Sequence, residues 1–386
     1  MLLFSTRRFT SLLCSGAIAL GLVACPQQSP PPELRVGLIA GFTGETAAAI
    51  GPSSTQAAEL AVQEANRNGG LQVGKRKYTV TLILADDRNN PEEAVKVAQK
   101  LINQDNAIAI VGPYISREAI PVAQVVENAQ IPMISPTSTN PKTTENKQYV
   151  FRVVFTDEFQ GRVMANFARE ELKVSKAAVL YDRASDYNRS IAEIFQQVFQ
   201  QTGGEVVAFE TYTTDTNQDF RPQLQRIRDS GAEILFLPNY EQELYLQVQQ
   251  ARELGIQIPL LGSDTWEALN PAKNPQLEGS FFSTNYAPDP TNPKNQAFIK
   301  AYRELYQNEP DNVAALTYDA FGLLFEAIES QGETDPAKIR EGLSQIQQFI
   351  GVSGTAEFAG TGDPIKSAAI MQIKTGQVSF YKSVAP

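Results

Sequence analysis

The stretch AIAIVGPYIS, residues 107–116, decides the fold class, because it joins a short apolar run to a helix start through a glycine-proline turn. Residues 107–111 carry small and branched apolar side chains, which is typical of a strand buried on both faces. After Ser116, Ile120 and Ala123 lie three residues apart, which is the spacing of apolar residues on one face of a helix. A buried strand that leads directly into an amphipathic helix is the unit of a parallel α/β sheet.

The same unit repeats along the chain in two successive sets. In the first set, strands are expected at residues 34–40, 80–85, 107–111 and 131–134, and helices at 56–68 and from Asn90. The second set follows residues 149–155, with a helix expected at 157–172 and strands at 177–181, 206–209, 234–238 and 259–261. The chain then predicts helices at 295–307 and 313–329 and strands at 368–373 and 378–381. Two such sets predict two doubly wound, Rossmann-like α/β lobes that bind ligands beyond the carboxyl ends of their strands.

The composition narrows the possible functions. With 386 residues, the chain exceeds what a single core usually organises, and 42% hydrophobic and 20% charged residues are ordinary for a globular protein. The formal net charge of −10 disfavours binding to nucleic acid, whose phosphates it would repel. The absence of histidine excludes catalytic triads that use it and removes the commonest metal ligand. We therefore expect no metal and no cofactor.

The first residues have the layout of a secretory signal. Two arginines precede an apolar run at residues 9–24, so we interpret residues 1–24 as a signal peptide. The tripeptide before Cys25 resembles a bacterial lipoprotein box, in which the cysteine is lipidated; the alternative is an ordinary signal with a chance cysteine. The proline-rich residues 25–33 are then an extended linker between a membrane anchor and the folded domain.

Two patterns that suggest chemistry fail on their spacing. Asp215, Asn217 and Asp219 imitate the start of a calcium loop, but Phe220 and Arg226 stand where that loop needs glycine and glutamate. The spacing indicates instead that Asp219 caps the helix that follows it.

A second pair of carboxylates fails for a different reason. Asp86 and Asp87 are adjacent at the end of a predicted strand, so they point to opposite faces and do not converge on one bond. The chain also contains no GxSxG, phosphate-loop or GxGxxG motif. The sequence therefore predicts that the protein is not an enzyme.

Hydroxyl groups follow two strands of the first set. Ser116 opens a helix directly after a buried strand, where the positive end of the helix suits a carboxylate. The alternative is that Ser116 only caps its helix. Residues 135–139, SPTST, come after the next strand and either add donors to the same rim or form a plain polar loop.

The second set offers groups of complementary chemistry. Tyr187, Tyr240 and Asp264 each follow a predicted strand, and Asp264 is the charged one of the three. An α-amino acid presents a carboxylate and an ammonium group close together. Donors on one lobe and a carboxylate on the other would therefore hold it with charge-assisted hydrogen bonds.

Several stretches in fixed order give the chain a family resemblance. They are Gly41-Phe42-Thr43-Gly44, Ala65-Asn66 with Gly69-Gly70, residues 110–116, Ile131-Pro132-Met133-Ile134-Ser135-Pro136 with Thr139, Tyr181-Asp182 with Tyr187, and Leu261-Gly262-Ser263-Asp264. From Leu34 onward the chain resembles the leucine/isoleucine/valine-binding family of type I periplasmic solute receptors. The resemblance implies a hinged, non-catalytic fold of two lobes that close on a ligand. We assign residues 34–154 and 285–350 to lobe 1, and residues 155–284 and 351–386 to lobe 2.

The resemblance also implies roles for single residues. The ligand carboxylate would be held by the hydroxyls of Ser116 and Thr139 and by the backbone of Thr137. Its ammonium group would meet Asp264.

Further residues would complete this pocket. Tyr187 and Tyr240 would close over the ligand. Phe42 and Ile50 are expected to give the pocket an apolar or roomy wall, and Arg117 either admits an acidic side chain or points to solvent.

One departure from the family concerns a loop beside the predicted site. Some relatives clamp this loop with a disulfide whose two positions lie near Asn89 and at Ile115 here, so we expect packing alone to hold that loop. Trp266 lies two residues beyond Asp264 and is a further candidate for lining the pocket.

The resemblance finally implies a transport role. The protein would be the substrate-binding lipoprotein of an ABC importer that takes up a neutral or branched-chain amino acid. Its partners would be the permease and ATPase subunits, and it would act as a monomer, held outside the cytoplasm on a bacterial membrane through Cys25. Binding of urea, short amides or another small carboxylate stays open, as does a role in ligand sensing. A hydrolase that used Asp264 and Tyr187 would lack a nucleophile paired with a base.

Overall fold

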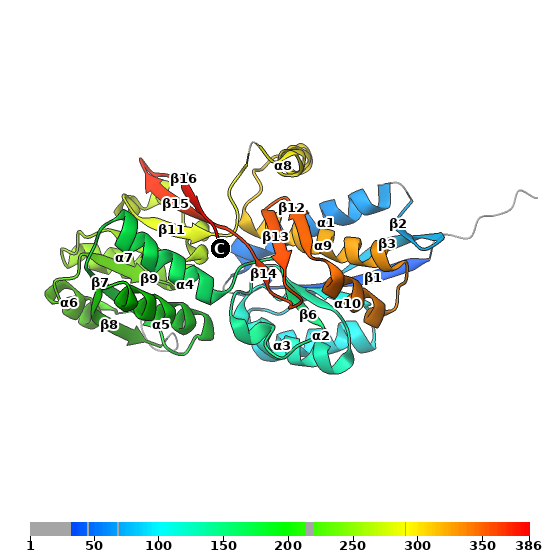
Figure 1. The fold of residues 1–386 in the computed structure, drawn as a ribbon, viewed down its shortest axis with the longest axis horizontal. Coiled ribbons are helices and arrows are strands. Elements are labelled where there is room, and N and C mark those ends of the chain that lie inside the picture. Colours follow the sequence, from blue (N-terminus) through cyan, green and yellow to red (C-terminus); the bar gives the residue numbers. More distant parts are fainter. Residues whose placement is uncertain (1–31, 45, 68, 214–218, 290) are drawn as a thin grey trace, which may run out of the picture. The chain divides into compact units, whose positions relative to one another are not determined.

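The computed structural model describes residues 32–44, 46–67, 69–213, 219–289 and 291–386. The predicted signal peptide, Cys25 and most of the proline-rich linker therefore lie outside the described residues, as do Asp215 and Asn217 of the rejected calcium loop. Within the described part, the strands form two large sheets and one small one (Figure 1).

The first sheet is almost entirely parallel. Its strand order is β2-β3-β1-β4-β5-β6, and the β2–β3 pair is antiparallel. The strands are β1 (Glu33–Ala40), β2 (Leu71–Val73), β3 (Arg76–Asp86), β4 (Ala109–Val111), β5 (Met133–Ser135) and β6 (Val150–Arg152). Its connections carry the helices α1 (Ala47–Arg67), α2 (Pro91–Asn103) and α3 (Ser116–Ala129) and the 3₁₀ turn η1 (Pro141–Thr143). This architecture confirms the α/β class expected from the alternating runs.

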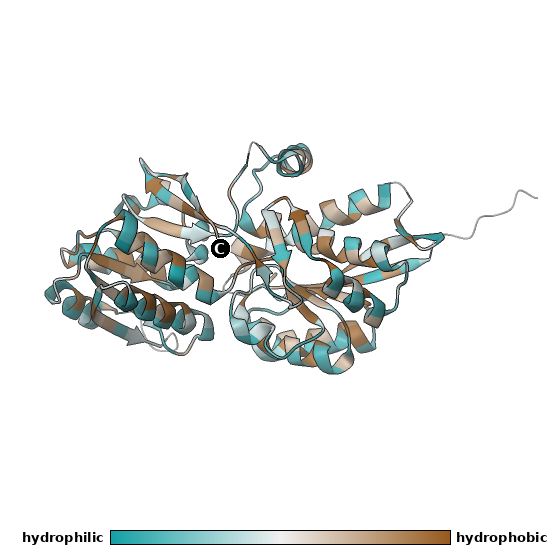
Figure 2. Ribbon diagram, viewed as in Figure 1, coloured by the Kyte–Doolittle hydropathy of each residue, from teal (hydrophilic) through white to brown (hydrophobic). Residues whose placement is uncertain are grey.

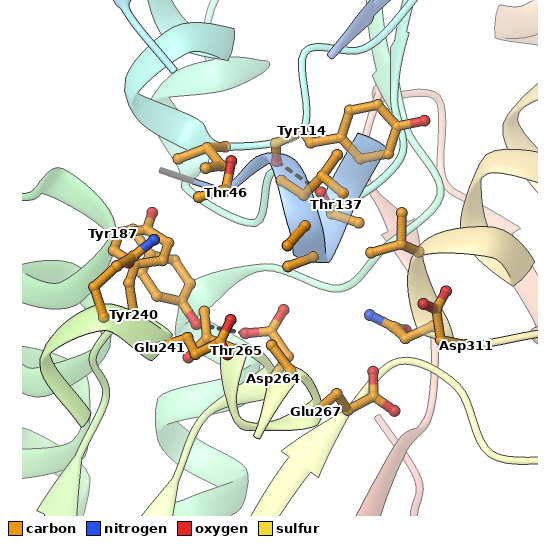
Figure 3. Close-up of a pocket in the computed structure, with 18 of the residues that line it drawn as sticks. Thr46, Tyr114, Thr137, Tyr187, Tyr240, Glu241, Asp264, Thr265, Glu267 and Asp311 are labelled. Atoms are coloured by element: carbon orange, nitrogen blue, oxygen red, sulfur yellow. Dashed lines mark hydrogen bonds between the residues drawn. The ribbon is translucent and has the colours of Figure 1, made fainter. Parts of the chain in front are cut away.

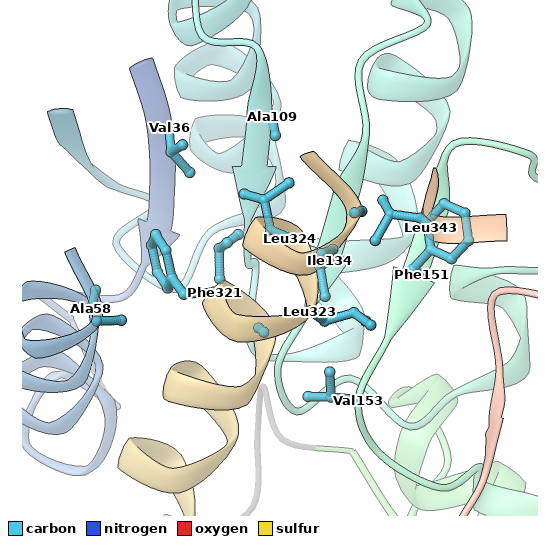
Figure 4. Close-up of a cluster of buried hydrophobic side chains, with 14 of the residues drawn as sticks. Val36, Ala58, Ala109, Ile134, Phe151, Val153, Phe321, Leu323, Leu324 and Leu343 are labelled. Atoms are coloured by element: carbon cyan, nitrogen blue, oxygen red, sulfur yellow. The ribbon is translucent and has the colours of Figure 1, made fainter. Parts of the chain in front are cut away.

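Strand β1 contributes to a different hydrophobic core on each of its faces, because successive strand residues point to opposite sides. Val36 and Leu38 lie in a core covered by α1 and α9 (Asn312–Gln331), whereas Ile39 lies in a core covered by α2 and α3. Figure 4 shows Phe321 and Leu324 of α9 among the side chains of the first core. Burial on both faces explains why this strand reads as a continuous apolar run.

The second sheet has the strand order β16-β15-β11-β10-β9-β7-β8. Its strands are β7 (Lys176–Asp182), β8 (Glu205–Tyr212), β9 (Ile234–Leu237), β10 (Leu260–Gly262), β11 (Phe281–Thr284), β15 (Ala368–Lys374) and β16 (Gln377–Val384). The strands from β7 to β11 are parallel, and β15 and β16 add an antiparallel edge. The helices are α4 (Asp157–Asn166), which continues as the π-helix η2 (Phe167–Glu171), α5 (Asp186–Gln201), α6 (Arg221–Asp229) and α7 (Glu241–Glu253), with 3₁₀ turns η3 (Asp264–Ala268), η4 (Pro271–Lys273) and η5 (Pro275–Leu277).

The elements between β11 and β15 pack with the first lobe and form no further strands of the two large sheets. They are α8 (Pro293–Tyr306), α9, α10 (Pro336–Gln345) and a small antiparallel sheet of β12 (Gln348–Gly351), β13 (Gly354–Phe358) and β14 (Pro364–Ile365). Ala356 and Phe358 of β13 are buried in the core shared by α9 and β1. The expected boundary at residue 351 is therefore too early, because the chain rejoins the second sheet with β15.

Three segments connect the lobes, and hydrogen bonds join them. The segments lie between β6 and α4, between β11 and α8, and between β14 and β15. The backbone N–H of Phe155 in the first segment donates to Oδ1 of Asn285 in the second at 3.1 Å. Lys366 Nζ in the third segment donates to the carbonyl of Val153 in the first at 3.2 Å. The three connecting segments are thus tied to one another between the two large sheets.

The largest difference from the expected elements is at α1. The helix begins at Ala47, well before the expected residue 56, and Pro52 lies inside it. Ile50, Ala57 and Ala58 are buried, and this tertiary packing outweighs the helix-breaking tendency of Pro52. Figure 2 shows the apolar residues concentrated on the sheets and on the helix faces that cover them. Among the described helices, none combines the length and hydropathy that crossing a bilayer requires.

Candidate functional site

A cavity of about 470 Å³ opens where the carboxyl ends of strands from both large sheets meet loops and helix starts. This is the place where doubly wound folds bind ligands. Ile50, Ser116, Thr137, Tyr187, Tyr240 and Asp264, six of the predicted residues, line it. The structure also places predicted residues elsewhere: Phe42, Arg117, Thr139 and Trp266 lie outside the lining.

Ser116 lies at the first position of α3, and the residue that precedes the helix is Ile115, which makes no side-chain capping bond. The alternative role of Ser116 as a helix cap is therefore wrong. Its hydroxyl instead lies 2.9 Å from the Ser138 hydroxyl and accepts a long hydrogen bond, at 3.4 Å, from the Asn140 backbone. The hydroxyl is thereby held beside the amides of a helix N-terminus, which favour an anion.

The loop after β5 contributes Thr137 to the cavity lining. The Thr137 hydroxyl donates to the Tyr114 carbonyl at 2.7 Å, so this side chain is already occupied. The fully buried guanidinium of Arg152 fixes this loop, because it donates hydrogen bonds to the Ser138 and Asn140 carbonyls at 2.8 and 2.9 Å. Arg152 also forms an ion pair with Asp363 at 2.7 Å. These contacts hold the backbone donors of the loop in place.

Thr139 belongs to the same loop but does not reach the cavity. It is fully buried, and its carbonyl accepts a hydrogen bond from the Asp157 backbone at 3.0 Å. Burial raises the pKa of Asp157 to about 7, and the Thr139 side chain opposes that rise. Thr139 is thus absent from the cavity lining, and its Oγ1 is a buried oxygen without a hydrogen-bond partner among the described residues, so its contact with a ligand stays a prediction.

Asp264 supplies the negative charge on the opposite side. Its Oδ1 accepts hydrogen bonds from Gln160 Nε2 at 3.0 Å and from the Tyr187 hydroxyl at 2.5 Å. Burial raises the pKa of Asp264, and the bonds from Tyr187 and Gln160 lower it in part. These hydrogen bonds orient the carboxylate and partly stabilise its charged form. Burial still disfavours that charge, which a bound cation would stabilise.

Two aromatic rings stand beside this carboxylate. Tyr187 and Tyr240 stack with centroids 5.2 Å apart and an interplanar angle of 29°. Burial raises the pKa of both phenols, so both are neutral hydrogen-bonding groups at physiological pH. Figure 3 shows the pair at one end of the cavity, next to Asp264. Their faces form an apolar wall around the predicted ammonium site.

Arg117 and Phe42 are directed away from the lining. The Arg117 side chain is half exposed and pairs with Glu118 at 3.0 Å, while its Nη2 donates to the Asn89 carbonyl at 2.9 Å. Phe42 packs against the first hydrophobic core. Asn89 in turn accepts a hydrogen bond from the backbone of Thr46 at 2.9 Å. Polar contacts thus hold the loop that some relatives clamp with a disulfide, and our expectation that packing alone holds it is wrong.

Trp266 is fully buried and lies in a 3₁₀ turn. Its Nε1 donates to the Leu237 carbonyl at 3.0 Å, and its ring lies over Gly262. Since residues three apart overlap along a 3₁₀ helix, Glu267 shares the face of Asp264 and Trp266 does not. The expectation that Trp266 lines the pocket is therefore wrong, and Glu267 takes that place.

Thirteen further lining residues were not predicted, among them the polar residues Thr46, Glu267, Asp311 and Asn312. The spacing of three from Asp264 could have identified Glu267, had the 3₁₀ turn been recognised. Asp311 precedes α9 and accepts from the Ala314 backbone at 2.8 Å, which reads in a sequence as an ordinary helix cap. No local pattern shows that the start of α9 comes back to the cavity.

The carboxylates of the two motifs that were rejected in the sequence accept hydrogen bonds from nearby backbone. Asp86 accepts hydrogen bonds from the backbone of Phe42 and Thr43, at 3.0 and 3.1 Å, while the buried Asp87 accepts from Asn89 at 3.0 Å. The two carboxyl groups thus serve different loops. Asp219 accepts from the Arg221 backbone at 3.2 Å, one residue ahead of the position expected for a cap.

Comparison with known proteins agrees with this geometry. Residues 33–377 match the periplasmic binding protein family. An amino acid binding protein from Pseudomonas aeruginosa is 31% identical over 325 residues, which cover 83% of this chain and 85% of the relative.

Solved structures give the same result. A leucine binding protein from Thermotoga maritima aligns with a TM-score of 0.83 and 31% identity, over 92% of this chain and 99% of that one. A branched-chain amino acid transporter substrate binding protein from Streptococcus pneumoniae, in complex with isoleucine, aligns with a TM-score of 0.82 and 29% identity, over 92% and 100% of the two chains. The resemblance read from the sequence is confirmed: the chain belongs to the periplasmic binding protein family, in its type I, leucine/isoleucine/valine-binding group.

Proposed function

We propose that this protein binds a free amino acid in the cavity and delivers it to the permease and ATPase subunits of an ABC importer. The observation that carries the proposal is the opposed chemistry of the lining. On the first lobe Ser116 and Thr137 line the cavity, and in our proposal the Ser116 hydroxyl and the Thr137 backbone N–H donate hydrogen bonds to the ligand. On the second lobe, Asp264 offers a carboxylate. A zwitterion that touches both lobes would use both sets at once. The relatives named above are binding proteins, and we assign no catalytic role.

Binding in such a cleft is coupled to movement of the lobes. A ligand that contacts both lobes binds the closed form more tightly than the open form, so it shifts the population toward closure. Three segments connect the lobes, which allows rotation about a hinge while each core stays intact. In our proposal, the closed form is the shape that the permease recognises, and the protein acts as a monomer.

The proposal includes a lipid anchor at Cys25. The supporting observation is the sequence alone: a basic and apolar leader, a lipoprotein-like box and a proline-rich spacer ahead of β1. Each acyl methylene buried in a bilayer contributes about 0.8 kcal/mol, so several acyl chains would hold the protein firmly outside the cytoplasm.

A thermal-shift screen tests the proposed function. The purified chain would be heated with each amino acid, and with urea and simple amides as controls. A ligand at 100 times its dissociation constant stabilises a protein by about 2.7 kcal/mol, which a shift in melting temperature reports. We expect at least one amino acid to raise the melting temperature. A shift with urea or amides and with no amino acid would contradict the proposal.

A further inference from the structure

The cavity contains more negative charge than an α-amino acid needs. Glu241, Asp264, Glu267 and Asp311 line it, whereas its described lining contains neither lysine nor arginine. One carboxylate, Asp264, is enough to pair with one ammonium group. The proposed function assigns no ligand contact to the other three, of which Asp311 also accepts hydrogen bonds from the Ala314 backbone and the Ser53 hydroxyl.

Two of these groups gather at the end away from the tyrosines. Figure 3 shows Asp264 between Tyr187 on one side and Glu267 and Asp311 on the other. Burial raises the pKa of Glu267 well above its usual value, and the nearby charges of Asp311 and Asp264 raise it further. Burial also raises the pKa of Asp311. A bound cation at this end would relieve the repulsion that these carboxylates exert on one another.

The same end also contains acceptors without donors. Asn312 is 8% exposed, and its Oδ1 accepts no hydrogen bond from any residue that the structure describes. Oε2 of Glu267 is buried and equally without a donor within the described residues. A buried acceptor that lacks a partner costs about 1–3 kcal/mol. Both residues line the cavity, so a ligand that brings hydrogen-bond donors to these two oxygens would remove this cost.

The approach to this end is apolar. Ile50, Ala268 and Val313 line the cavity together with the acidic groups. An aliphatic stem that ends in a charged group matches such a wall, because long basic side chains bury their methylenes and keep a polar head. Among the described residues, no three His, Cys, Asp or Glu side chains are arranged to hold a metal ion. An organic cation is therefore the better match for these carboxylates.

We propose that the preferred ligand is an amino acid whose side chain ends in a cation, such as an ammonium or guanidinium group, held by Glu267, Asp311 and Asn312. This inference rests on the proposed function, since the backbone of the same ligand occupies the Ser116 and Asp264 end. The neutral, branched-chain specificity expected from the resemblance is replaced by a basic one.

Calorimetry with pairs of matched ligands tests the inference. L-Lysine is compared with L-norleucine, which lacks only the terminal ammonium group, and L-arginine with its neutral analogue L-citrulline. We expect the wild-type protein to bind at least one basic member of these pairs about tenfold or more tightly than its neutral analogue, a difference of about 1.4 kcal/mol.

Two variants assign this preference to residues. Glu267→Gln keeps the shape of the side chain and removes its charge, and Asp311→Asn retains an acceptor for the α9 backbone. Each should reduce the basic-to-neutral affinity ratio about tenfold or more while leaving norleucine binding within about threefold of wild type. Glu304→Gln, on the exposed face of α8, removes the same charge away from the cavity and should leave the ratio unchanged.

The outcomes separate this inference from the proposed function. Leucine or norleucine binding as tightly as lysine and arginine would overturn the basic specificity and leave amino-acid capture intact. An unchanged ratio in both Glu267→Gln and Asp311→Asn would overturn the assignment to this end of the cavity. Absence of binding by any amino acid, basic or neutral, would overturn both.

Discussion

The Tyr187 hydroxyl donates a hydrogen bond of 2.5 Å to Oδ1 of Asp264, the oxygen that also accepts from Gln160. Tyr187 lies in the first turn of α5 and Asp264 in the 3₁₀ turn after β10, so the bond joins the starts of two helical segments of one lobe. It orients the carboxylate before any ligand arrives. Because the bond is made to the charged form, it also lowers the pKa of Asp264 against the effect of burial.

Removal of this hydroxyl should make binding more sensitive to acid. An ammonium ligand needs the ionised carboxylate, so affinity is complete above the pKa of Asp264 and is lost as the pH falls through it. Tyr187→Phe removes a bond that lowers this pKa, so the pKa rises and the loss should begin at a higher pH. Affinity for the best amino-acid ligand, measured by calorimetry from acidic to neutral pH, checks this.

Tyr240→Phe is the matched control for that experiment. Tyr240 stacks on Tyr187 but is not a hydrogen-bond donor to Asp264 in the described contacts. Its loss should leave the midpoint of the pH profile unchanged. Equal profiles for Tyr187→Phe and wild type would show that the hydroxyl does not control the charge of Asp264.

Gly262→Ala should destabilise the second lobe. A Cβ atom at Gly262 would lie 2.1 Å from the ring of Trp266, which is fully buried and fixed by its hydrogen bond to Leu237. Overpacking of this kind costs about 1–3 kcal/mol or more, and the midpoint of urea unfolding should fall accordingly. In Gly51→Ala the nearest atom is 3.5 Å away, and alanine favours the helix by up to about 1 kcal/mol, so this control should be neutral or stabilising. A midpoint for Gly262→Ala equal to that of wild type would rule out this packing.

Cys25→Ala should release the protein from the membrane. If Cys25 carries the lipid, wild type should remain with membranes after washing at high salt and dissolve in detergent, whereas the variant should appear in the soluble fraction. Cys14→Ala, which lies within the predicted signal peptide, keeps Cys25 and should behave as wild type. Persistence of Cys25→Ala in washed membranes would show that something other than this cysteine holds the protein there.

Most of the fold could be predicted from the sequence, because the strands that are buried on both faces appear as continuous apolar runs. The run at 34–40 is such a case, with Leu38 and Ile39 in different cores. The start of α1 could not be predicted, since Pro52 reads locally as a helix breaker and only packing reveals the longer helix. The placement of β13 depends on where Phe358 is buried, which is a long-range contact.

The candidate site was predictable where a lining residue lies within a few residues of the carboxyl end of a strand. Ser116, Thr137 and Asp264 belong to this class, and all three line the cavity. The error at Trp266 came from counting along the chain without the 3₁₀ turn that faces it inward. Asp311 escaped prediction because its segment comes from a distant part of the chain and looks like an ordinary helix start.

The central claim is that the charge of Asp264 holds the ammonium group of a bound amino acid. Calorimetry on Asp264→Asn tests it most directly, because the variant keeps the shape of the side chain and removes its charge. Loss of one partner of a buried charge pair costs about 2–5 kcal/mol, so affinity for the best amino-acid ligand should fall roughly 30-fold to several thousand-fold. Asp229→Asn, an exposed carboxylate on α6, should bind as wild type. A folded Asp264→Asn variant that binds within about threefold of wild type, a loss below about 0.7 kcal/mol, would contradict the account.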